Sequence, residues 1–176
     1  MTERAPIVLI VSGPVGVGKS SVGSEVSLLL SEQNIAHTFV DLDNLAHTFP
    51  RPADDRFGSA LAHRNLKDVW RNCAEVGSKN LILARVAETG GYVDKIAEII
   101  PGSEPIVCRL TASDETLVAR VASREIGSDY DWHAKRSLEL SRSLAETGPT
   151  DFTVETDHRT VTEIAGEIVR SVDWRT

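Results

Sequence analysis

The sequence has few cysteines and no long apolar run. Its two cysteines, Cys73 and Cys108, fall in a predicted helix and a predicted strand, so we expect small core residues there and neither a disulfide framework nor a metal site. Near the N-terminus only five apolar residues, 7 to 11, occur in a row, which is too short for a signal peptide or a membrane span. The sequence therefore predicts a cytoplasmic protein with no membrane partner.

Basic residues are scarce relative to acidic ones. The chain has 19 Lys and Arg against 26 Asp and Glu, which gives a net charge of −7. Sequence-independent binding to nucleic acid needs clustered Lys and Arg, so we expect no nucleic-acid partner. A phosphate site needs only a local positive field, and the acidic balance therefore does not exclude a bound nucleotide.

Short apolar runs alternate with segments of helical periodicity. The apolar runs predict strands over 7–11, 37–41, 81–86, 106–110 and 152–155. Helices are predicted over about 22–30, 61–78 and 92–100, from 113 onward, and after a capping box formed by Thr160 and Glu163. Strands that alternate with helices form parallel βαβ units. We therefore expect a single α/β domain over residues 1–176, with three layers and roughly five parallel strands, that binds ligands beyond the carboxyl ends of its strands.

The segment between the first strand and the first helix matches G-x-x-x-x-G-K-[ST], from Gly13 to Ser20. Glycines let the backbone turn so that N–H groups point inward as a nest for phosphate oxygens, and the helix start adds the positive end of its dipole. Lys19 is expected to reach the β- and γ-phosphates, Ser20 to ligate Mg²⁺ and Ser21 to reach the α-phosphate. The pattern predicts an ATP and Mg²⁺ site made by Gly13, Val15, Gly16, Val17, Gly18, Lys19, Ser20 and Ser21.

Two acidic residues follow the second predicted strand. Asp41 and Asp43 are spaced so that both side chains point the same way if the chain stays extended, at the edge beside the phosphate loop. One would act as general base toward a substrate hydroxyl, and the other would hold Mg²⁺ through water. We assign the base to Asp43 and the metal to Asp41, although the two roles are exchangeable. A solvated turn in which Asp43 caps the next helix is the alternative.

The phosphate loop, followed about 20 residues later by Asp41-Leu42-Asp43, resembles the small-molecule kinases of the P-loop class: shikimate, gluconate and adenylylsulfate kinases. Residues 41–45 are especially similar to the D-G-D-N-hydrophobic stretch of adenylylsulfate kinases, and Arg64-Asn65-Leu66 is similar to their helix that presents an Arg and an Asn to the substrate. The resemblance implies the P-loop NTPase fold and phosphoryl transfer to a small molecule. The acceptor is not implied, because the K-G-L-Y segment of adenylylsulfate kinases and the triple glycine of shikimate kinases are both missing.

Such kinases exclude water and neutralise charge while the phosphoryl group moves, and the planar donors of arginine suit this task. We expect a lid at about residues 120–142, hinged at Gly127-Ser128, in which Arg120 and Arg124 stabilise the transferred group and Arg120 also contacts the nucleotide. A solvated helix face is the alternative for these two arginines. Trp132 and His133 are expected to pack against the lid helix.

Other charged residues lie near the predicted ligand edge. Arg85 ends an apolar strand, where its charge needs either a ligand or a salt bridge. Arg64 lies on the helix expected to cover the substrate, with an exposed surface position as the alternative. The predicted acceptor contacts are Asp41, Asp43, Arg64 and Arg85. After the fifth strand, Asp157 and Arg159 are placed beside the nucleotide base, with an ordinary turn as the alternative.

Together these features predict an ATP-dependent phosphotransferase, monomeric or homodimeric, that acts on a hydroxyl of a metabolite or an antibiotic. A nucleoside or nucleotide kinase is a subclass of this prediction. A GTPase-like switch is an alternative, since residues 55–58 fit D-x-x-G, but residues 65–68 hold the residues of N-K-x-D in the wrong order. An ATPase that serves a partner is a further alternative, which the missing acidic residue at the end of the third strand disfavours.

Overall fold

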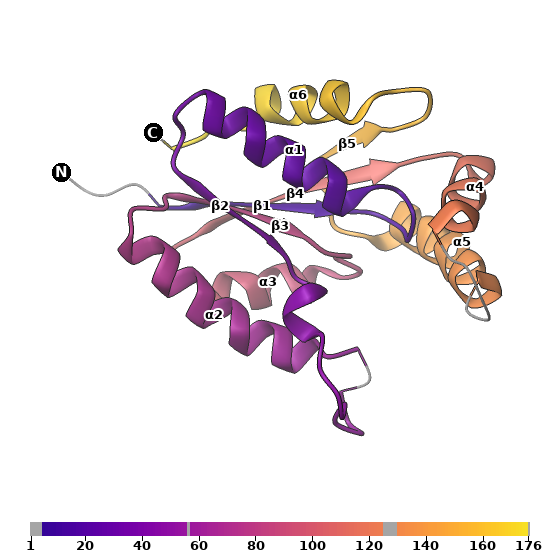
Figure 1. The fold of residues 1–176 in the computed structure, drawn as a ribbon, viewed down its shortest axis with the longest axis horizontal. Helices are drawn as coiled ribbons and strands as arrows, with labels where there is room; N and C mark the ends of the chain where they lie inside the picture. Colours follow the sequence, from indigo (N-terminus) through magenta and orange to yellow (C-terminus); the bar gives the residue numbers. More distant parts are fainter. Residues whose placement is uncertain (1–4, 56, 125–129, 176) are drawn as a thin grey trace.

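The fold is built around one five-stranded parallel sheet (Figure 1). The structure is a computed structural model that describes residues 5–55, 57–124 and 130–175. The strands lie in the order β2-β3-β1-β4-β5, with the bounds β1 Ile7–Ser12, β2 His37–Asp41, β3 Asn80–Ala84, β4 Glu104–Thr111 and β5 Phe152–Glu155. The α/β class and the five parallel strands predicted from the sequence are confirmed.

Three strands differ in length from their predictions, and β1 differs only by the added Ser12. The prediction of 81–86 is wrong at its carboxyl end, because β3 stops at Ala84. The Arg85 amide still donates to the Val11 carbonyl (3.2 Å), but Arg85 is no longer part of the strand. The fourth strand is longer than 106–110. Its first residue, Glu104, donates to the Pro6 carbonyl (2.9 Å), and its last, Thr111, accepts from the Thr156 amide (2.9 Å).

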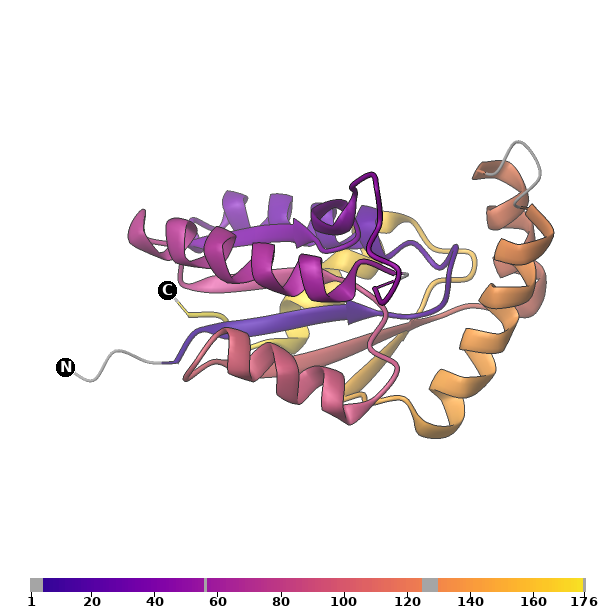
Figure 2. The ribbon, with the colours of Figure 1, turned by 90° about the horizontal axis from the view of Figure 1, so that it is seen from below.

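Helices cover both faces of the sheet and its carboxyl-terminal edge. Their bounds are α1 Lys19–Glu32, the short 3₁₀ helix η1 Asn44–Ala46, α2 Ser59–Glu75, α3 Gly90–Ile99, α4 Asp114–Arg124, α5 Tyr130–Thr147 and α6 Val161–Ser171. Helices α1 and α6 lie on one face and α2 and α3 on the other, which makes three layers, while α4 and α5 lie beyond the strand ends and α5 runs across them (Figures 1 and 2). None of the described helices has the length and apolar character needed to cross a membrane.

The central strand β1 supplies both halves of the core. Successive side chains of a strand point to opposite faces of its sheet. Ile7, Leu9 and Val11 therefore pack with residues of α1 and α6, whereas Val8 and Ile10 pack with residues of α2 and α3. All six residues of β1 are buried, which explains why the sequence shows an unbroken apolar run here instead of alternation.

A buried asparagine ties the end of the chain to the sheet. Asn80, the first residue of β3, has no exposed surface. Its Nδ2 donates to the Ala36 and Arg175 carbonyls (2.8 Å each), and its Oδ1 accepts from the Arg175 amide (3.0 Å). One side chain thus joins β3, the segment before β2 and the segment after α6.

We expect the substitution Asn80→Ala to lower the free energy of unfolding by about 2 to 3 kcal/mol, because it removes three part-buried hydrogen bonds to backbone groups of Ala36 and Arg175. Urea denaturation at neutral pH measures the change. Asn72→Ala, on the exposed surface of α2, is the matched control and should stay within about 0.5 kcal/mol of the wild type. Equal stabilities of the two variants would contradict this role for Asn80.

Candidate functional site

The phosphate loop between β1 and α1 turns on three glycines with positive φ. The φ angles are 144° at Gly13, 82° at Gly16 and 106° at Gly18. A Cβ at Gly13 would lie 2.7 Å from the Leu110 carbonyl oxygen, whereas one at Gly18 would meet no atom within 4 Å. Glycine is therefore required at Gly13 by close packing and at Gly18 by the backbone conformation. Helix α1 begins directly after Gly18, and the amides of a first helical turn are the groups that commonly bind phosphate.

Lys19 and two serines complete the polar groups of this loop. Lys19 Nζ donates to the carbonyls of Gly13 (3.1 Å) and Pro14 (3.0 Å), so the loop curls around the ammonium group. Ser20 and Ser21 are exposed at the start of α1. These groups fit a triphosphate. Ser20 also fits Mg²⁺, which commonly takes only one or two protein ligands together with phosphate oxygens and water.

Helices α4 and α5 hold the phosphate loop from outside. The Ser137 hydroxyl on α5, which is fully buried, donates to the Val15 carbonyl (2.6 Å). On α4, Arg120 donates to the Val17 carbonyl (3.1 Å) and to the hydroxyl and carbonyl oxygens of Thr156 (2.9 and 3.0 Å). Arg120 thus joins the loop to the segment after β5, and its predicted roles in catalysis and nucleotide binding remain predictions.

The chain turns between the two acidic residues, Asp41 at the end of β2 and Asp43 just after it. Asp43 has φ −64° and ψ −34°, so the chain turns there instead of staying extended. The Asp41 carboxylate holds this turn by accepting from the Asp43 amide (3.1 Å). Asp43 is the N-cap residue of η1 and its side chain is 63% exposed, as in the alternative of a solvated turn, but the side chain makes no capping hydrogen bond to η1.

Arg85 joins the segment after β2 to the start of α2. Its guanidinium group donates to the Asp43 carboxylate through Nη1 and to the Ser59 hydroxyl through Nη2 (3.1 Å). Only 13% of the Arg85 side chain is exposed, so its charge needs this pairing. Arg85 therefore forms the salt bridge that was the alternative to a ligand contact, and its partner Asp43 is itself a predicted acceptor contact.

A cleft of about 1180 Å³ opens beside the phosphate loop. Its remaining walls come from η1 and the loop that follows it, the segment between β3 and α3, and α5. Arg136 of α5 donates to Glu88 after β3 (2.8 Å), which links two of these walls. The cleft is lined by Val15, Gly16, Gly18, Lys19, Ser20, Asp43, Asn44, Ala46, His47, Arg51, Phe57, Ser59, Arg85, Val86, Glu88, Thr89, Tyr92, Trp132, His133, Arg136 and Leu140.

The cleft is locally positive although the chain is acidic. Four of its lining residues are cationic, Lys19, Arg51, Arg85 and Arg136, and two are acidic, Asp43 and Glu88. Both acidic residues already pair with arginines of the cleft. Such a local field attracts a polyphosphate in spite of the net charge of −7.

Two of the predicted acceptor contacts, Asp41 and Arg64, are not among the described residues that line this cleft. Arg64 is exposed on α2, and it is not among the described residues that line the cleft. Its neighbour Asn65 instead donates to the Leu45 carbonyl (2.7 Å) and so fixes η1 against α2. The Arg124 side chain and the predicted hinge at Gly127-Ser128 lie outside the described residues.

The residues predicted to border the nucleotide base lie at a depression of about 420 Å³, on the other side of the phosphate loop and at the ends of β4 and β5. It is lined by Thr111, Ala112, Ser113, Glu155, Asp157 and His158. Asp157 accepts from the Thr116 hydroxyl and from the amide (2.8 Å) and hydroxyl (2.9 Å) of Ser113, at the start of α4. Arg159 is paired with Glu167 of α6 (2.7 Å). The position of Asp157 fits the prediction, whereas that of Arg159 also fits an ordinary strand-to-helix turn.

Several lining residues were not predicted from the sequence. Glu88 and Tyr92 line the cleft, and Ser137 donates to the carbonyl of the lining residue Val15, but these residues come from segments that share no short-range pattern. Trp132, expected to pack against the lid helix, is instead 48% exposed and lines the cleft. Arg136 belongs to the segment 120–142 that was predicted as a lid, but the prediction assigned the role in transfer to Arg120 and Arg124.

The two segments that were compared with GTPase motifs make contacts within the fold. Asp55 of the D-x-x-G segment accepts from the amides of Ala60 (3.0 Å) and Leu61 (3.3 Å), so it caps the start of α2. Asp68 of the reordered N-K-x-D segment forms an exposed ion pair with Arg71 on the same helix (3.1 Å). Neither acidic residue lines either depression.

We expect the contribution of Asp157 to stability to depend on pH. Hydrogen bonds from Thr116, and then from Ser113, lower the pKa of Asp157 in the folded chain. A lowered pKa means that the stabilisation is complete above the unfolded value near 3.9 and is lost as the pH falls through the folded value. Asp157→Asn should therefore cost roughly 1 kcal/mol at pH 7, allowing for solvent exposure, and progressively less below about pH 4. Denaturation at several pH values tests this, with the exposed Asp94→Asn as control, and a cost that does not vary with pH would contradict it.

No protein-family model matches the sequence, and no curated protein matches it either. Solved structures match almost the whole chain. A gluconokinase from Sinorhizobium meliloti 1021 is 22% identical, with a TM-score of 0.62 over 95% of this chain and 91% of that one. The APS kinase of Mycobacterium tuberculosis, solved in complex with AMPPNP and APS, is 20% identical, with a TM-score of 0.56 over 95% and 96%. The tunicamycin resistance protein of Deinococcus radiodurans is 15% identical, with a TM-score of 0.63 over 98% of each chain.

A shikimate kinase is matched as well. At these identities the likeness establishes the fold. The resemblance to small-molecule kinases of the P-loop class is therefore confirmed, and the chain has the three-layer P-loop fold that these structures share.

Proposed function

We propose that the chain is a kinase that transfers the γ-phosphoryl group of ATP, bound with Mg²⁺, to a hydroxyl of a small molecule. The observation that carries the proposal is that Lys19 of the phosphate loop and Asp43 after β2 line one cleft, which α5 bounds on another side. A phosphate-binding group and a candidate base that share one cavity are what phosphoryl transfer to a hydroxyl requires.

The residues divide this task between them. The loop amides, Lys19 and Ser20 hold the triphosphate and its Mg²⁺, which neutralises the charge of the transferred group. The acceptor hydroxyl forms a bond to the γ-phosphorus, the bond between that phosphorus and ADP breaks, and the hydroxyl proton passes to Asp43. Asp43 uses one carboxylate oxygen for Arg85, and its 63% exposure leaves it accessible to the acceptor. Arg85 holds this carboxylate at the cleft wall.

The flanking residues extend the proposal. Arg136, which reaches the cleft from α5, would stabilise charge on the transferred group, together with Arg120 and Arg124 if the 120–142 segment closes further. Asp41 would meet Mg²⁺ through water, and Asp157 would border the base in the depression at the ends of β4 and β5. In contrast, β3 ends at Ala84 followed by Arg85, without the acidic residue of a hydrolytic motor.

The proposal is tested by measuring ATP consumption with Mg²⁺ across a panel of hydroxylated metabolites, nucleosides and antibiotics, with mass spectrometry to detect the added phosphoryl group. A phosphorylated product would establish the kinase and name its acceptor. Nucleotide binding without transfer to any compound in a broad panel would argue against it and favour an ATPase that serves a partner.

With an acceptor in hand, we expect Asp43→Asn to lower kcat by about 10² to 10⁴, because the amide cannot take up the hydroxyl proton. The KM for ATP should change little, since the phosphate loop is untouched. Asp54→Asn, an exposed carboxylate of the neighbouring loop outside the cleft, is the matched control. If Asp41→Asn shows the larger loss of kcat, the two assigned roles are exchanged. Full activity of both variants would mean that neither Asp41 nor Asp43 is the general base.

A further inference from the structure

The cleft gathers a large share of the few aromatic rings of the chain. Aromatic residues make up only 5% of the sequence, as four Phe, three Trp and two Tyr. Of these, Phe57, Tyr92 and Trp132 line the cleft, and His47 and His133 add two imidazole rings. Phosphoryl transfer itself uses charged and hydroxyl groups and needs none of these rings. Their concentration therefore calls for a separate explanation.

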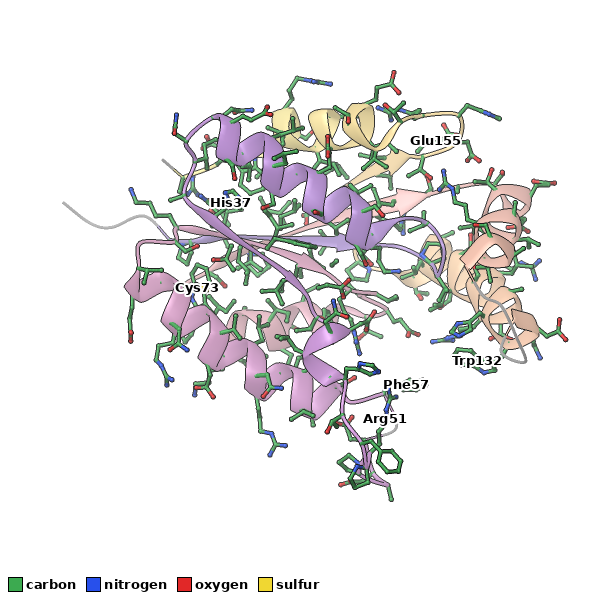
Figure 3. All side chains as sticks on the ribbon, in the orientation of Figure 1. His37, Arg51, Phe57, Cys73, Trp132 and Glu155 are labelled. Atoms are coloured by element: carbon green, nitrogen blue, oxygen red, sulfur yellow. The ribbon has the colours of Figure 1, made fainter. Side chains whose placement is uncertain are left out.

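Two of these rings are exposed on opposite walls. Phe57 precedes α2 and is 56% exposed, and Trp132 lies on α5 and is 48% exposed. Figure 3 shows both at the opening between the α2 side and α5, with Arg51 beside Phe57. Large apolar rings that face solvent across a cavity are typical of a surface that a ligand covers. Trp132 also contacts the His133 ring edge-on, at 4.8 Å between centroids, which restrains its orientation.

Tyr92 offers a polar group in the same cleft. Its hydroxyl oxygen is buried and has no hydrogen-bond partner among the described residues. Tyr92 lies at the start of α3, and its ring packs against the His63 ring of α2 (5.7 Å between centroids). Burial raises the pKa of Tyr92, and Asp43 adds to this against the opposing effect of Arg85, so the group stays a neutral O–H near both residues. A buried hydroxyl without a partner favours a ligand that supplies one.

We infer that the acceptor carries a planar unsaturated ring, which is held between Phe57 and Trp132 while its hydroxyl arm reaches Asp43 and a polar ring atom meets Tyr92. This inference rests on the proposed kinase function and names the class of its acceptor: a hydroxylated compound with an aromatic ring, such as a nucleoside or a ring-bearing cofactor precursor. Open-chain sugar acids and saturated polyols leave both rings unused. The guanidinium groups of Arg51 and Arg136 at the same cleft suit the electron-rich faces of such a ring.

The first experiment measures binding by calorimetry in the presence of Mg²⁺ and AMPPNP. The ring-bearing probes are adenosine, uridine and pyridoxine, and the probes without an aromatic ring are gluconate, shikimate and ribitol. We expect at least one ring-bearing probe to bind. The three probes without an aromatic ring should bind at least about tenfold more weakly, since stacking of one base on an aromatic side chain is worth about this factor or more. Preference for a nucleoside over pyridoxine, or the reverse, separates the two sources of the ring.

The second experiment uses variants of the two exposed rings. Trp132→Ala and Phe57→Ala should each raise the KM or Kd of the ring-bearing acceptor about tenfold or more and change kcat much less. Trp132→Phe, which keeps a ring, should stay within about threefold of the wild type. Phe49→Ala is the matched control: Phe49 is 95% exposed in the same loop as Phe57 and is not among the residues that line the cleft, so no change is expected.

The outcomes separate this inference from the proposed function. Ring-bearing probes that bind through Trp132, while no compound gains a phosphoryl group, support the aromatic site and count against the kinase. Phosphorylation of gluconate or another polyol with unchanged KM in Trp132→Ala and Phe57→Ala supports the kinase and overturns the inference. Failure of every ring-bearing probe to bind at millimolar concentration also overturns it.

Discussion

The hydrogen-bonded pairing of β1 with both β3 and β4 determines where each group of the site lies. In this pairing Val11 stands opposite Ala84 on one side and Cys108 on the other. Because parallel strands end at one edge, the phosphate loop leaves the sheet between two neighbours that end beside it. Acidic and basic residues after β2 and β3 form the wall of the large cleft, and residues after β4 and β5 form the smaller depression. The phosphate loop therefore separates the two proposed halves of the site, for acceptor and for nucleotide base.

The fold and the phosphate loop could be predicted from the sequence because both depend on short-range information. The run of apolar residues in β1 identifies a strand buried on both faces, and the glycine spacing that follows specifies a turn whose backbone amides bind the ligand. Asp43 could be placed for the same reason, since a residue just after a parallel strand lies at the ligand edge whatever the distant chain does. Its pairing with Arg85 needed only that β2 and β3 be neighbours.

The other walls could not be predicted, because they depend on contacts between segments far apart in the chain. The link from Arg136 to Glu88 and that from Ser137 to Val15 both require α5 to cross the strand ends, and no local pattern specifies this path. The same dependence on distant contacts applies to the partners of Arg120. Its spacing in the helix suggested a catalytic role, but the described partners of its guanidinium group are oxygens of Val17 and Thr156. The turn at Asp43 was open as an alternative to an extended chain, and the sequence could not decide between them because the turn is held by a hydrogen bond of the Asp41 side chain, which strand periodicity does not encode.

The contact of Lys19 with the carbonyls of Gly13 and Pro14 affects how one common experiment should be understood. Replacing the lysine of such a loop is the usual way to abolish nucleotide binding. In this chain the ammonium group also donates to two carbonyls of the loop, so its removal leaves both carbonyls without this donor. An inactive Lys19→Met protein would thus combine a missing phosphate contact with an altered resting loop. Substitutions at Ser20, whose side chain is exposed, perturb the ligand contact while the curled backbone keeps its central cation.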